Sequence, residues 1–450
     1  AFEARPWELK KTETIDVMDA VGSNIRVDTY GWEVKRILPR INEDINEEWI
    51  SDKTRYACDG IKNQRLDTPY VKKDGRHEKT TWDFALNYIA EKINKSPSEK
   101  IAGLTGDLTN METLFIIKEF FHKTIKSKNL ESRVEDYYVN ISDRKNYIFN
   151  SKINGIEESD LIIFIGTNPR YEATILNARI RKSYLKNKTE IFSFGDVGDL
   201  TYPYKILDNK SDIIKDVIES KNDLSSKIKN AKKPIIIIGQ SALKLKSGKF
   251  IFEKFKEFLM RNDKINNEWN SLNVLSKDAS TVGSYDLTLF SSNNGRNLLL
   301  EKLNSNSIDL LFLLGQDKLK IKRDGIFVVY IGSHGDEGAR NSDLIFPACA
   351  FTEQDGYYTN LEGKIQKAYK ASYPTELSKE DWQIINEISN LIRGKSLYKD
   401  KDELIDNMLN YLNQNRKEEF VKTQNIFENE KITIEDIDYY FSNVIAKNSK

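Results

Sequence analysis

The sequence contains few of the residues that build metal sites and disulfide-rich folds. Two cysteines and three histidines occur among its 450 residues. Two thiols exclude a site with four cysteine ligands, for zinc or for an iron–sulfur cluster, and also a secreted fold held by several disulfides. Cys58 and Cys349 lie far apart and are expected to stay reduced. The scattered His77, His122 and His334 show no metal-binding spacing.

Long apolar runs and an excess of one charge are also missing. No run approaches the ~20 residues needed to cross a bilayer, so direct membrane insertion is not expected. Basic and acidic residues number 69 each, and this balance gives no electrostatic case for nucleic acid as a partner. With 39% hydrophobic residues, the chain is expected to fold around a substantial core, in about three domains.

What the sequence does contain is a series of short apolar runs that end in glycine. They are too short for buried helices, and their β-branched and aromatic residues suit strands covered on both faces. Helical patterns lie between them, for example over 82–93. This alternation predicts a mainly parallel, doubly wound α/β fold. The runs occupy 100–106, 160–166, 190–195, 234–239, 309–315 and 326–332.

The two ends of the chain differ from this pattern. Residues 1–72 hold short β-prone pieces at 24–31 and 33–39, and we expect a small, β-rich lobe there. Towards the other end, 403–412 and 434–446 are expected to form amphipathic surface helices. A partner-binding tail is the alternative for this end.

Two polar turns follow predicted strands. Gly166, Thr167, Asn168, Pro169 and Arg170 join a strand to a helix, with Asn168 as N-cap and Pro169 in the first turn. Such a turn either binds an anion at the helix N-terminus or is only a strand–helix connection. Both readings stay open.

The second turn covers 334–340 and contains a histidine, two carboxylates and an arginine. These groups either take part in acid–base chemistry or satisfy one another within the turn. Asp343, Glu353 and Glu362 add carboxylates at a spacing that fits no calcium or magnesium loop. The residues alone therefore indicate an α/β protein with turns that could bind an anion without clear specificity. A nucleotide-binding protein that acts outside any complex remains an alternative at this point.

Longer stretches resemble one family. Residues 4–31, 36–60, 144–182, 269–275 and 334–366 are similar, in chain order, to the large iron–sulfur subunit of respiratory complex I (NADH:ubiquinone oxidoreductase). The similarity is to the part of that subunit that follows its cluster-bearing N-terminal domains. This resemblance implies a small vestigial cluster lobe followed by doubly wound domains of the molybdopterin-oxidoreductase type.

The resemblance also implies which residues stand at the sites of the related enzymes. Those enzymes hold a [4Fe–4S] cluster with the spacing C-x2-C-x3-C-x27-C, which falls here on Asp16, Asp19, Ser23 and Ser51. Carboxylates and hydroxyls are hard donors that suit the cluster poorly, so we expect no metal and no cluster in this lobe. The turn Gly166–Arg170 corresponds to a segment beside the pterin dinucleotide, and no catalytic residue is expected.

The function implied by the resemblance is that of a non-catalytic structural subunit, or split-off C-terminal part, of the peripheral arm of complex I. Iron–sulfur clusters and FMN are expected in partner chains, and a cysteine-rich cluster-bearing chain is expected at the N-terminus. The expected location is the matrix side of the mitochondrial inner membrane, or the cytoplasmic side of a bacterial plasma membrane. The alternative is a molybdopterin-dependent oxidoreductase similar to formate dehydrogenases.

By the same resemblance the expected domains are a lobe at 1–72, a discontinuous α/β domain at 73–142 and 334–395, an inserted α/β domain at 143–333, and a helical tail at 396–450.

Within the lobe, Ile25, Trp49 and Ile50 are expected to pack inside. Phe2, Pro6, Trp7 and Leu9 form an apolar opening that either folds back on the lobe or meets the cluster-bearing partner.

Overall fold

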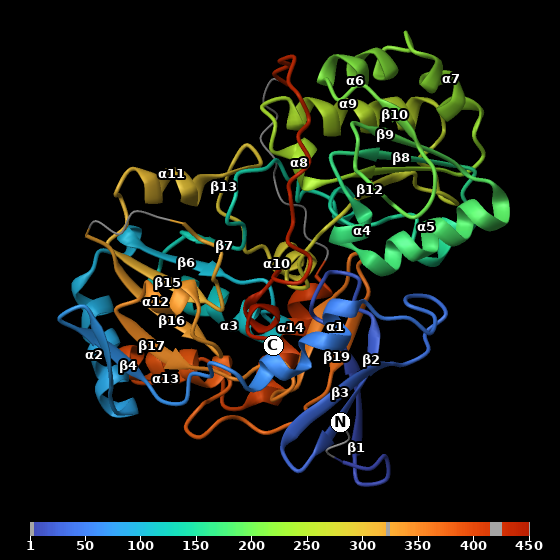
Figure 1. Cartoon of the computed structure of the whole chain (residues 1–450). Helices are drawn as coiled ribbons and strands as arrows, with labels where there is room; N and C mark the ends of the chain where they lie inside the picture. Colours follow the sequence, from blue (N-terminus) through green and yellow to red (C-terminus); the bar gives the residue numbers. More distant parts are fainter. Residues whose placement is uncertain (1–3, 321–324, 415–424, 450) are drawn as a thin grey trace.

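Two parallel sheets organise most of the chain, and a small antiparallel lobe packs beside them (Figure 1). The computed structural model describes residues 4–320, 325–414 and 425–449. The six glycine-ended runs all form strands of these sheets, which confirms the predicted doubly wound α/β fold.

The N-terminal lobe is a three-stranded antiparallel sheet closed by a short helix. Ile25 and Ile50 are buried as predicted. Trp49 was expected inside but is 57% exposed, because Asn46 takes the interior position and holds the turn through bonds to the backbone oxygens of Arg40 and Trp49. The lobe contains β1 (Lys10–Ile15), β2 (Asn24–Tyr30), β3 (Glu33–Pro39) and α1 (Asp52–Tyr56), with the hairpin β18 (Gly356–Thr359) and β19 (Ile365–Ala368) packed against it.

In the described part of the chain, seven strands form the larger sheet, in the order β5-β4-β17-β16-β15-β6-β7. Its central pairs are parallel, whereas β4 runs antiparallel to both of its neighbours. The strands are β4 (Tyr70–Lys73), β5 (Arg76–Lys79), β6 (Ile101–Thr105), β7 (Leu130–Glu131), β15 (Leu310–Leu314), β16 (Phe327–Gly332) and β17 (Leu344–Pro347).

Alternate residues of these strands enter two separate cores, as expected for a sheet covered on both faces. Phe312 and Val329 face one core, while Leu311 and Val328 face the other. The first core is covered by α2 (Trp82–Lys95), α3 (Met111–Phe120), α13 (Asp381–Arg393) and α14 (Lys401–Leu412), and the second by α11 (Leu298–Asn304) and α12 (Glu337–Arg340).

The smaller sheet has the order β10-β9-β8-β11-β12 among the described residues, and every pairing in it is parallel. The order reverses between β8 and β11, which makes this pair a topological switch point. Its elements are β8 (Leu161–Ile165), α4 (Pro169–Glu172), α5 (Thr174–Asn187), β9 (Glu190–Phe194), β10 (Lys205–Leu207), α6 (Ser211–Ile218), α7 (Asp223–Asn230), β11 (Pro234–Ile238), α8 (Gln240–Leu243), α9 (Gly248–Arg261) and β12 (Leu272–Val274).

The sheet order corrects the expected domain boundaries. Strands β15 and β16 lie inside 143–333, yet they pair with β6 and β17 in the larger sheet. The last strand of the smaller sheet is β12. It is followed by the short helix α10 (Thr281–Asp286), which packs against α3 of the larger unit, and by the hairpin β13 (Ser292–Asn293) and β14 (Arg296–Asn297). Strand β4 begins at Tyr70, so the larger sheet also starts before 73.

The C-terminal part is only partly the expected helical tail. Helix α14 forms where 403–412 predicted it, and it packs on the larger unit through Leu404 and Met408. The helix predicted over 434–446 is wrong, because 434–443 is irregular with turns and only α15 (Val444–Lys447) is helical. Bonds to other units replace helical bonds there, for example from the Glu435 amide to Ser241.

Candidate functional site

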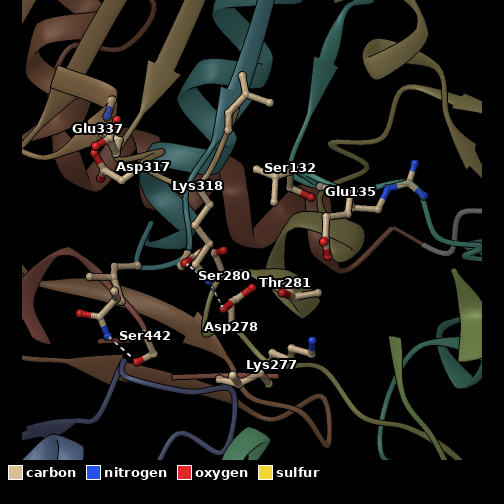
Figure 2. A pocket seen from close by; sticks show the side chains of 18 of the residues that line it. Ser132, Glu135, Lys277, Asp278, Ser280, Thr281, Asp317, Lys318, Glu337 and Ser442 are labelled. Carbon is tan, nitrogen blue, oxygen red and sulfur yellow. Dashed lines mark hydrogen bonds and ion pairs between the residues drawn. The ribbon is translucent and has the colours of Figure 1, made fainter. Parts of the chain in front are cut away.

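A cleft of about 1120 Å³ lies where the carboxyl ends of the two parallel sheets face each other (Figure 2). Asp107 follows β6 and Lys318 follows β15 in the larger sheet, while Gln240 follows β11 and Lys277 follows β12 in the smaller one. Open α/β sheets bind ligands at such switch points. The cleft is therefore the place where this fold positions a functional site.

Lys318 is the centre of charge on one side of the cleft. Its ammonium lies 2.5 Å from Asp107 Oδ2 and 3.3 Å from Asp278 Oδ1. Burial and the neighbouring Asp278 raise the pKa of Asp107 to about 6. Burial opposes the charge of Lys318, but the two carboxylates outweigh it and raise the pKa of the ammonium. This lysine is neutralised by the chain itself.

Asp317, next to Lys318, is also occupied. Tyr330 donates its hydroxyl proton to Asp317 at 2.9 Å, and the Gly338 amide donates at 3.0 Å. Burial raises the pKa of Asp317 to about 7. Despite that shift in pKa, the two hydrogen bonds that Asp317 accepts, one of them from α12, indicate a structural role. Asp317 holds the loop after β15 in place.

The turn Gly166–Arg170 forms as predicted, with Asn168 capping α4 and Pro169 in its first turn. Its amide and hydroxyl donors, however, face inwards. The Asn168 amide donates to Glu172 Oε1 at 3.0 Å, and the Thr167 hydroxyl donates to Glu172 Oε2 at 2.8 Å. Glu172 is 2% exposed, and its carboxylate stands where a bound anion would be.

Gly166 and Arg170 complete the turn in structural roles. Gly166 has φ +65°, and a Cβ there would lie 2.4 Å from the Ala242 amide nitrogen, so only glycine fits between the loops after β8 and β11. Arg170 binds the backbone oxygen of Asp199 at 2.6 Å and its carboxylate at 2.7 Å. Arg170 thus has the carbonyl and acidic partners that a cation at a helix start requires.

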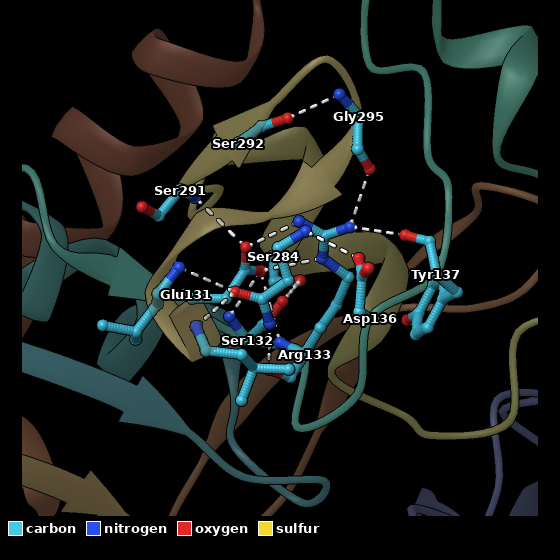
Figure 3. A network of polar contacts seen from close by, with 12 residues as sticks. Glu131, Ser132, Arg133, Asp136, Tyr137, Ser284, Ser291, Ser292 and Gly295 are labelled. Carbon is cyan, nitrogen blue, oxygen red and sulfur yellow. Dashed lines mark hydrogen bonds and ion pairs between the residues drawn. The ribbon is translucent and has the colours of Figure 1, made fainter. Parts of the chain in front are cut away.

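A buried polar network forms another wall of the cleft (Figure 3). Arg133 donates to Glu131 through Nε at 3.1 Å and through a terminal nitrogen at 2.7 Å. Its other terminal nitrogen donates to the backbone oxygens of Tyr137 and Gly295. Both charged side chains are at most 1% exposed. The network joins β7 to the hairpin β13–β14, and its arginine is fully engaged.

The four cluster-spaced positions lie at the other side of the cleft, in the N-terminal lobe, and all four are buried. The Met18 amide donates to Asp16 Oδ1 at 2.9 Å, and the Val21 amide donates to Asp19 Oδ1 at 3.0 Å. These are the local backbone contacts expected of two aspartates in place of thiolates.

Of the two serines, Ser51 is engaged through its hydroxyl and Ser23 through its backbone oxygen. Ser51 is the N-cap of α1 and shares a 2.8 Å hydrogen bond with Thr54, whose hydroxyl donates to Asp16. The Ser23 backbone oxygen accepts from the Asp16 amide at 2.9 Å. Burial, followed by the charge of Asp19, raises the pKa of Asp16 to about 7.

A lysine that sequence reasoning missed completes this site. Lys53 is 4% exposed, and its ammonium lies 3.4 Å from Asp19 Oδ2 and 5.5 Å from the centre of the Tyr439 ring. Two aspartates, two serines and a buried lysine are unsuited to an iron–sulfur cluster, which requires soft thiolate ligands. The residues present therefore do not fit a cluster.

The charged groups of the second polar turn are paired, Arg340 with Glu337 at 2.6 Å and Asp336 with Lys447 at 2.9 Å. His334 is fully buried, with Nε2 3.1 Å from the Gly60 backbone oxygen and Nδ1 2.8 Å from the Ser333 hydroxyl. Glu353 pairs with Arg65, and Glu362 accepts from the Ile153 amide. The reading of this stretch as a self-satisfied turn is supported.

Two further properties of the described residues bear on other functions. Across 4–320, 325–414 and 425–449, no group of three or more His, Cys, Asp or Glu side chains has a geometry that would hold a metal ion. No helix within the same ranges has both the length and the apolar character to cross a membrane. Cys58 and Cys349 are free thiols, and Cys349 is buried in a packing role.

The fold and the cleft define a protein of the molybdopterin-oxidoreductase class. Residues 65–391 match the family model described as molybdopterin oxidoreductase. The solved structure of acetylene hydratase from Pelobacter acetylenicus superimposes with a TM-score of 0.55 at 13% identity, over 90% of this chain and 72% of that one, which shows the shared fold.

The sequence relatives define the family more closely. Residues 9–59 match the model of the NADH-ubiquinone oxidoreductase NDSU1/NuoG-like 4Fe-4S domain. The mitochondrial 78 kDa subunit of NADH-ubiquinone oxidoreductase from Candida albicans is 43% identical over 89% of this chain and 55% of its own length. The corresponding NADH-quinone oxidoreductase subunit, designated G, from Rickettsia conorii is 37% identical over 100% of this chain and 67% of its own.

The chain therefore belongs to the family of the large subunit of respiratory complex I, which is the 75 or 78 kDa subunit of these relatives and its bacterial counterpart. This confirms the resemblance noted in the sequence. The chain spans between about half and two thirds of the length of these relatives.

The class implies a pterin dinucleotide, and the cleft does not suit one. Among the described residues that line it, acidic side chains outnumber basic ones by nine to six, which disfavours a ligand bearing several phosphates. The acidic residues are Asp107, Glu135, Glu172, Asp278, Asp317, Glu337, Glu435, Asp436 and Asp438, and the basic ones are Lys53, Arg133, Lys277, Lys318, Lys320 and Lys447.

Most of these lining residues escaped sequence reasoning. The signal that would have found Asp107 and Lys318 is their place within three residues of a glycine that ends a strand, at Gly106 and Gly315. No comparable signal exists for Glu435, which reaches the cleft from the far end of the chain.

Proposed function

We propose that this chain is a non-catalytic, structural part of the peripheral arm of respiratory complex I. Electrons then pass from NADH towards ubiquinone through FMN and iron–sulfur clusters that partner chains hold. The observation that carries the proposal is the engagement of the cluster-spaced residues: the carboxylates of Asp16 and Asp19 and the hydroxyl of Ser51 are used in internal contacts, and Ser23 is buried. The acidic cleft supports the same conclusion.

Exposed aromatic side chains on the N-terminal lobe support docking of a partner there. Trp7, Trp32 and Trp49 are 75%, 65% and 57% exposed. Tryptophan is enriched at protein interfaces, where it contributes strongly to binding. Leu9 is half-buried and Pro6 is exposed, while Phe2 lies outside the described residues. We propose that the partner is the cysteine-rich, cluster-bearing part of the arm.

The proposed location follows from the arm itself. Its place is the matrix side of the mitochondrial inner membrane, or the cytoplasmic side of the plasma membrane if the source is bacterial. Relatives of both kinds, from Candida albicans and from Rickettsia, support this pair of locations without choosing between them.

Iron analysis tests the non-catalytic role. After anaerobic reconstitution with iron and sulfide, the purified chain should retain only background iron, because its hard donors are engaged. A matched variant carries Asp16→Cys, Asp19→Cys, Ser23→Cys and Ser51→Cys and reports whether the spacing alone holds a cluster. Stoichiometric iron and sulfide in the native chain would overturn the proposal, and stoichiometric molybdenum or tungsten would favour an enzyme.

Crosslinking of the intact complex tests the partner. Lys10 and Lys11 lie in β1, close in sequence to Trp7, and should crosslink to the cluster-bearing part of the arm. The reagent-modified peptides can be identified by mass spectrometry from a native-gel band. Crosslinks confined to this chain in an intact complex would show that the partner binds elsewhere.

A further inference from the structure

The C-terminal segment, defined here as residues 425–449, crosses all three units of the molecule. In Figure 1 it is the red segment that descends from beside α6 and α9 and ends beside α1. Its residues contribute eight side chains to the wall of the cleft, which are Glu435, Asp436, Ile437, Asp438, Phe441, Ser442, Asn443 and Lys447.

The first anchor of the segment is at the beginning of α9. Glu430 accepts from the Ser247 amide at 2.9 Å and from the Lys246 amide at 3.2 Å. The Ser211 and Ser247 hydroxyls both donate to the Glu428 backbone oxygen, and the Glu428 amide donates to the Ser247 hydroxyl. Backbone amides at the start of a helix are donors suited to an anion, and here a carboxylate of the same chain takes them.

The second anchor is in the cleft. Glu435 Oε2 lies 2.5 Å from Lys277 and 3.1 Å from Lys244. Burial works against ionisation of Glu435, but the hydrogen bond and charge of Lys277 outweigh it and lower the pKa of the carboxyl. The side chain of Lys277 is 14% exposed and that of Glu435 is 38% exposed, so the pair is partly buried.

The third anchor is on the N-terminal lobe. Val444 and Ile445 are buried in the lobe core, and Asn443 caps the short helix they begin. The fit is close, since a Cβ on Gly60 would lie 2.1 Å from the Ile445 backbone oxygen. Lys447 adds an ion pair to Asp336 at 2.9 Å, beside the larger sheet.

We propose that the C-terminal segment is an internal strap that occupies two anion-binding positions, one at the start of α9 and one in the cleft, and locks the three units together. Helix-start amides and converging lysines are the groups that recognise phosphates, and the segment supplies a carboxylate to each. The chain thus closes its own cleft to anionic ligands such as nucleoside diphosphates. This inference concerns contacts within one chain and does not depend on assembly into complex I.

The test compares hydrogen exchange in the purified full chain and in the double variant Glu430→Gln and Glu435→Gln. Amides of 428–447 should exchange roughly tenfold faster in the double variant, the factor that corresponds to 1.4 kcal/mol. Amides of β8 and β11 should not change. Glu428→Gln is the matched control, because its ion pair with Lys246 is exposed and its removal should change exchange little.

Inorganic pyrophosphate serves as the anionic probe, with sodium chloride at matched ionic strength beside it. Pyrophosphate should speed exchange of the C-terminal segment further in the double variant and should leave the native chain unchanged. If the double variant does not fold, Glu435→Gln alone carries both measurements, with the same expected direction.

Two results would overturn the proposal. One is unchanged exchange of 428–447 in a folded variant, which would show that the carboxylates do not hold the segment. The other is saturable pyrophosphate binding by the native chain while the segment stays protected, which would show that the anion positions are open. Neither result bears on iron content or crosslinks, so failure here leaves the proposed function separately testable.

Discussion

The cluster-spaced positions and the cleft are both filled by polar groups of the chain itself, but over different distances in sequence. At the first site Asp16 and Asp19 bind amides two residues away, and Ser51 binds Thr54 three residues away. At the second, Lys277 meets Glu435 across 158 residues. The contacts of the first site, including those of Thr54 with Asp16 and of Lys53 with Asp19, lie within the N-terminal lobe, whereas the cleft needs residues from the far end of the chain. The two sites should therefore respond differently to substitution.

The largest effect is expected where a charge would be left buried without its partner. Asp19→Asn removes the carboxylate that faces the buried Lys53, and breaking a buried pair costs about 3–5 kcal/mol. Urea unfolding measures the loss. Lys53→Met combined with Asp19→Asn removes both charges and should recover much of it. A loss below about 1 kcal/mol for Asp19→Asn alone would show that solvent reaches the lysine.

The next effect tests the strap at its apolar end. Ile445 is 1% exposed in the core of the N-terminal lobe, and Ile445→Ala should cost about 2–5 kcal/mol. Trp49→Ala is the comparison within the same lobe, and it should change the free energy of unfolding by less than about 0.5 kcal/mol because Trp49 is exposed. Equal effects of the two substitutions would contradict the packing described for this lobe.

Acid should destabilise the chain through His334. Burial, followed by the charge of Arg65, lowers the pKa of His334 from 6.5 to about 3. Below pH 6.5 the unfolded chain therefore binds more protons, so this group's contribution is intact above 6.5 and is lost by about 1.4 kcal/mol per pH unit down to about 3. Between pH 7 and 5 the native chain should lose about 2 kcal/mol more stability than His334→Asn does, which urea unfolding at the two pH values measures.

Asp16 should show the opposite dependence. Its pKa is raised from 3.8 to about 7, so the folded chain binds more protons between these values, and its contribution declines as pH rises through them. Asp16→Asn can still accept from Met18 and lacks the charge. It should match the native chain near pH 4 and exceed it by roughly 1–2 kcal/mol at pH 8. A variant less stable at pH 8 would show that Asp16 is needed in its ionised form.

The smallest effect is expected at the Gly166 turn. Arg170 pairs with Asp199, whose side chain is 75% exposed, and exposed pairs contribute about 0–1 kcal/mol. Arg170→Ala should therefore change stability by less than about 1 kcal/mol. In cells Arg170→Ala should lower the amount of assembled complex without changing turnover per assembled complex. A larger loss of stability would mean that the Asp199 loop depends on this arginine.

Much of the fold was predictable because strands that are covered on both faces appear in the sequence as short, continuous apolar runs. Runs such as 160–166 and 234–239 are apolar throughout, and the glycine at the end of each marks the turn to a helix. The Asn168 cap and the positions of Asp16, Asp19, Ser23 and Ser51 were likewise readable, the last four only through the resemblance to a family. Trp49 was misplaced because hydrophobicity alone does not say which neighbour, here Asn46, fills the interior.

The sequence by itself determined the strands, the caps, the chemical class of the cluster-spaced residues and the family. The tertiary structure decided that β15 and β16 lie in one sheet with β6, that 434–443 is not helical, and that Glu435 reaches Lys277. The physical reason is the range of the interactions. Backbone geometry and the spacing of apolar residues depend on a few neighbouring residues and can be recognised in the sequence. Sheet order and ion pairs across the cleft depend on segments that meet only in the folded chain.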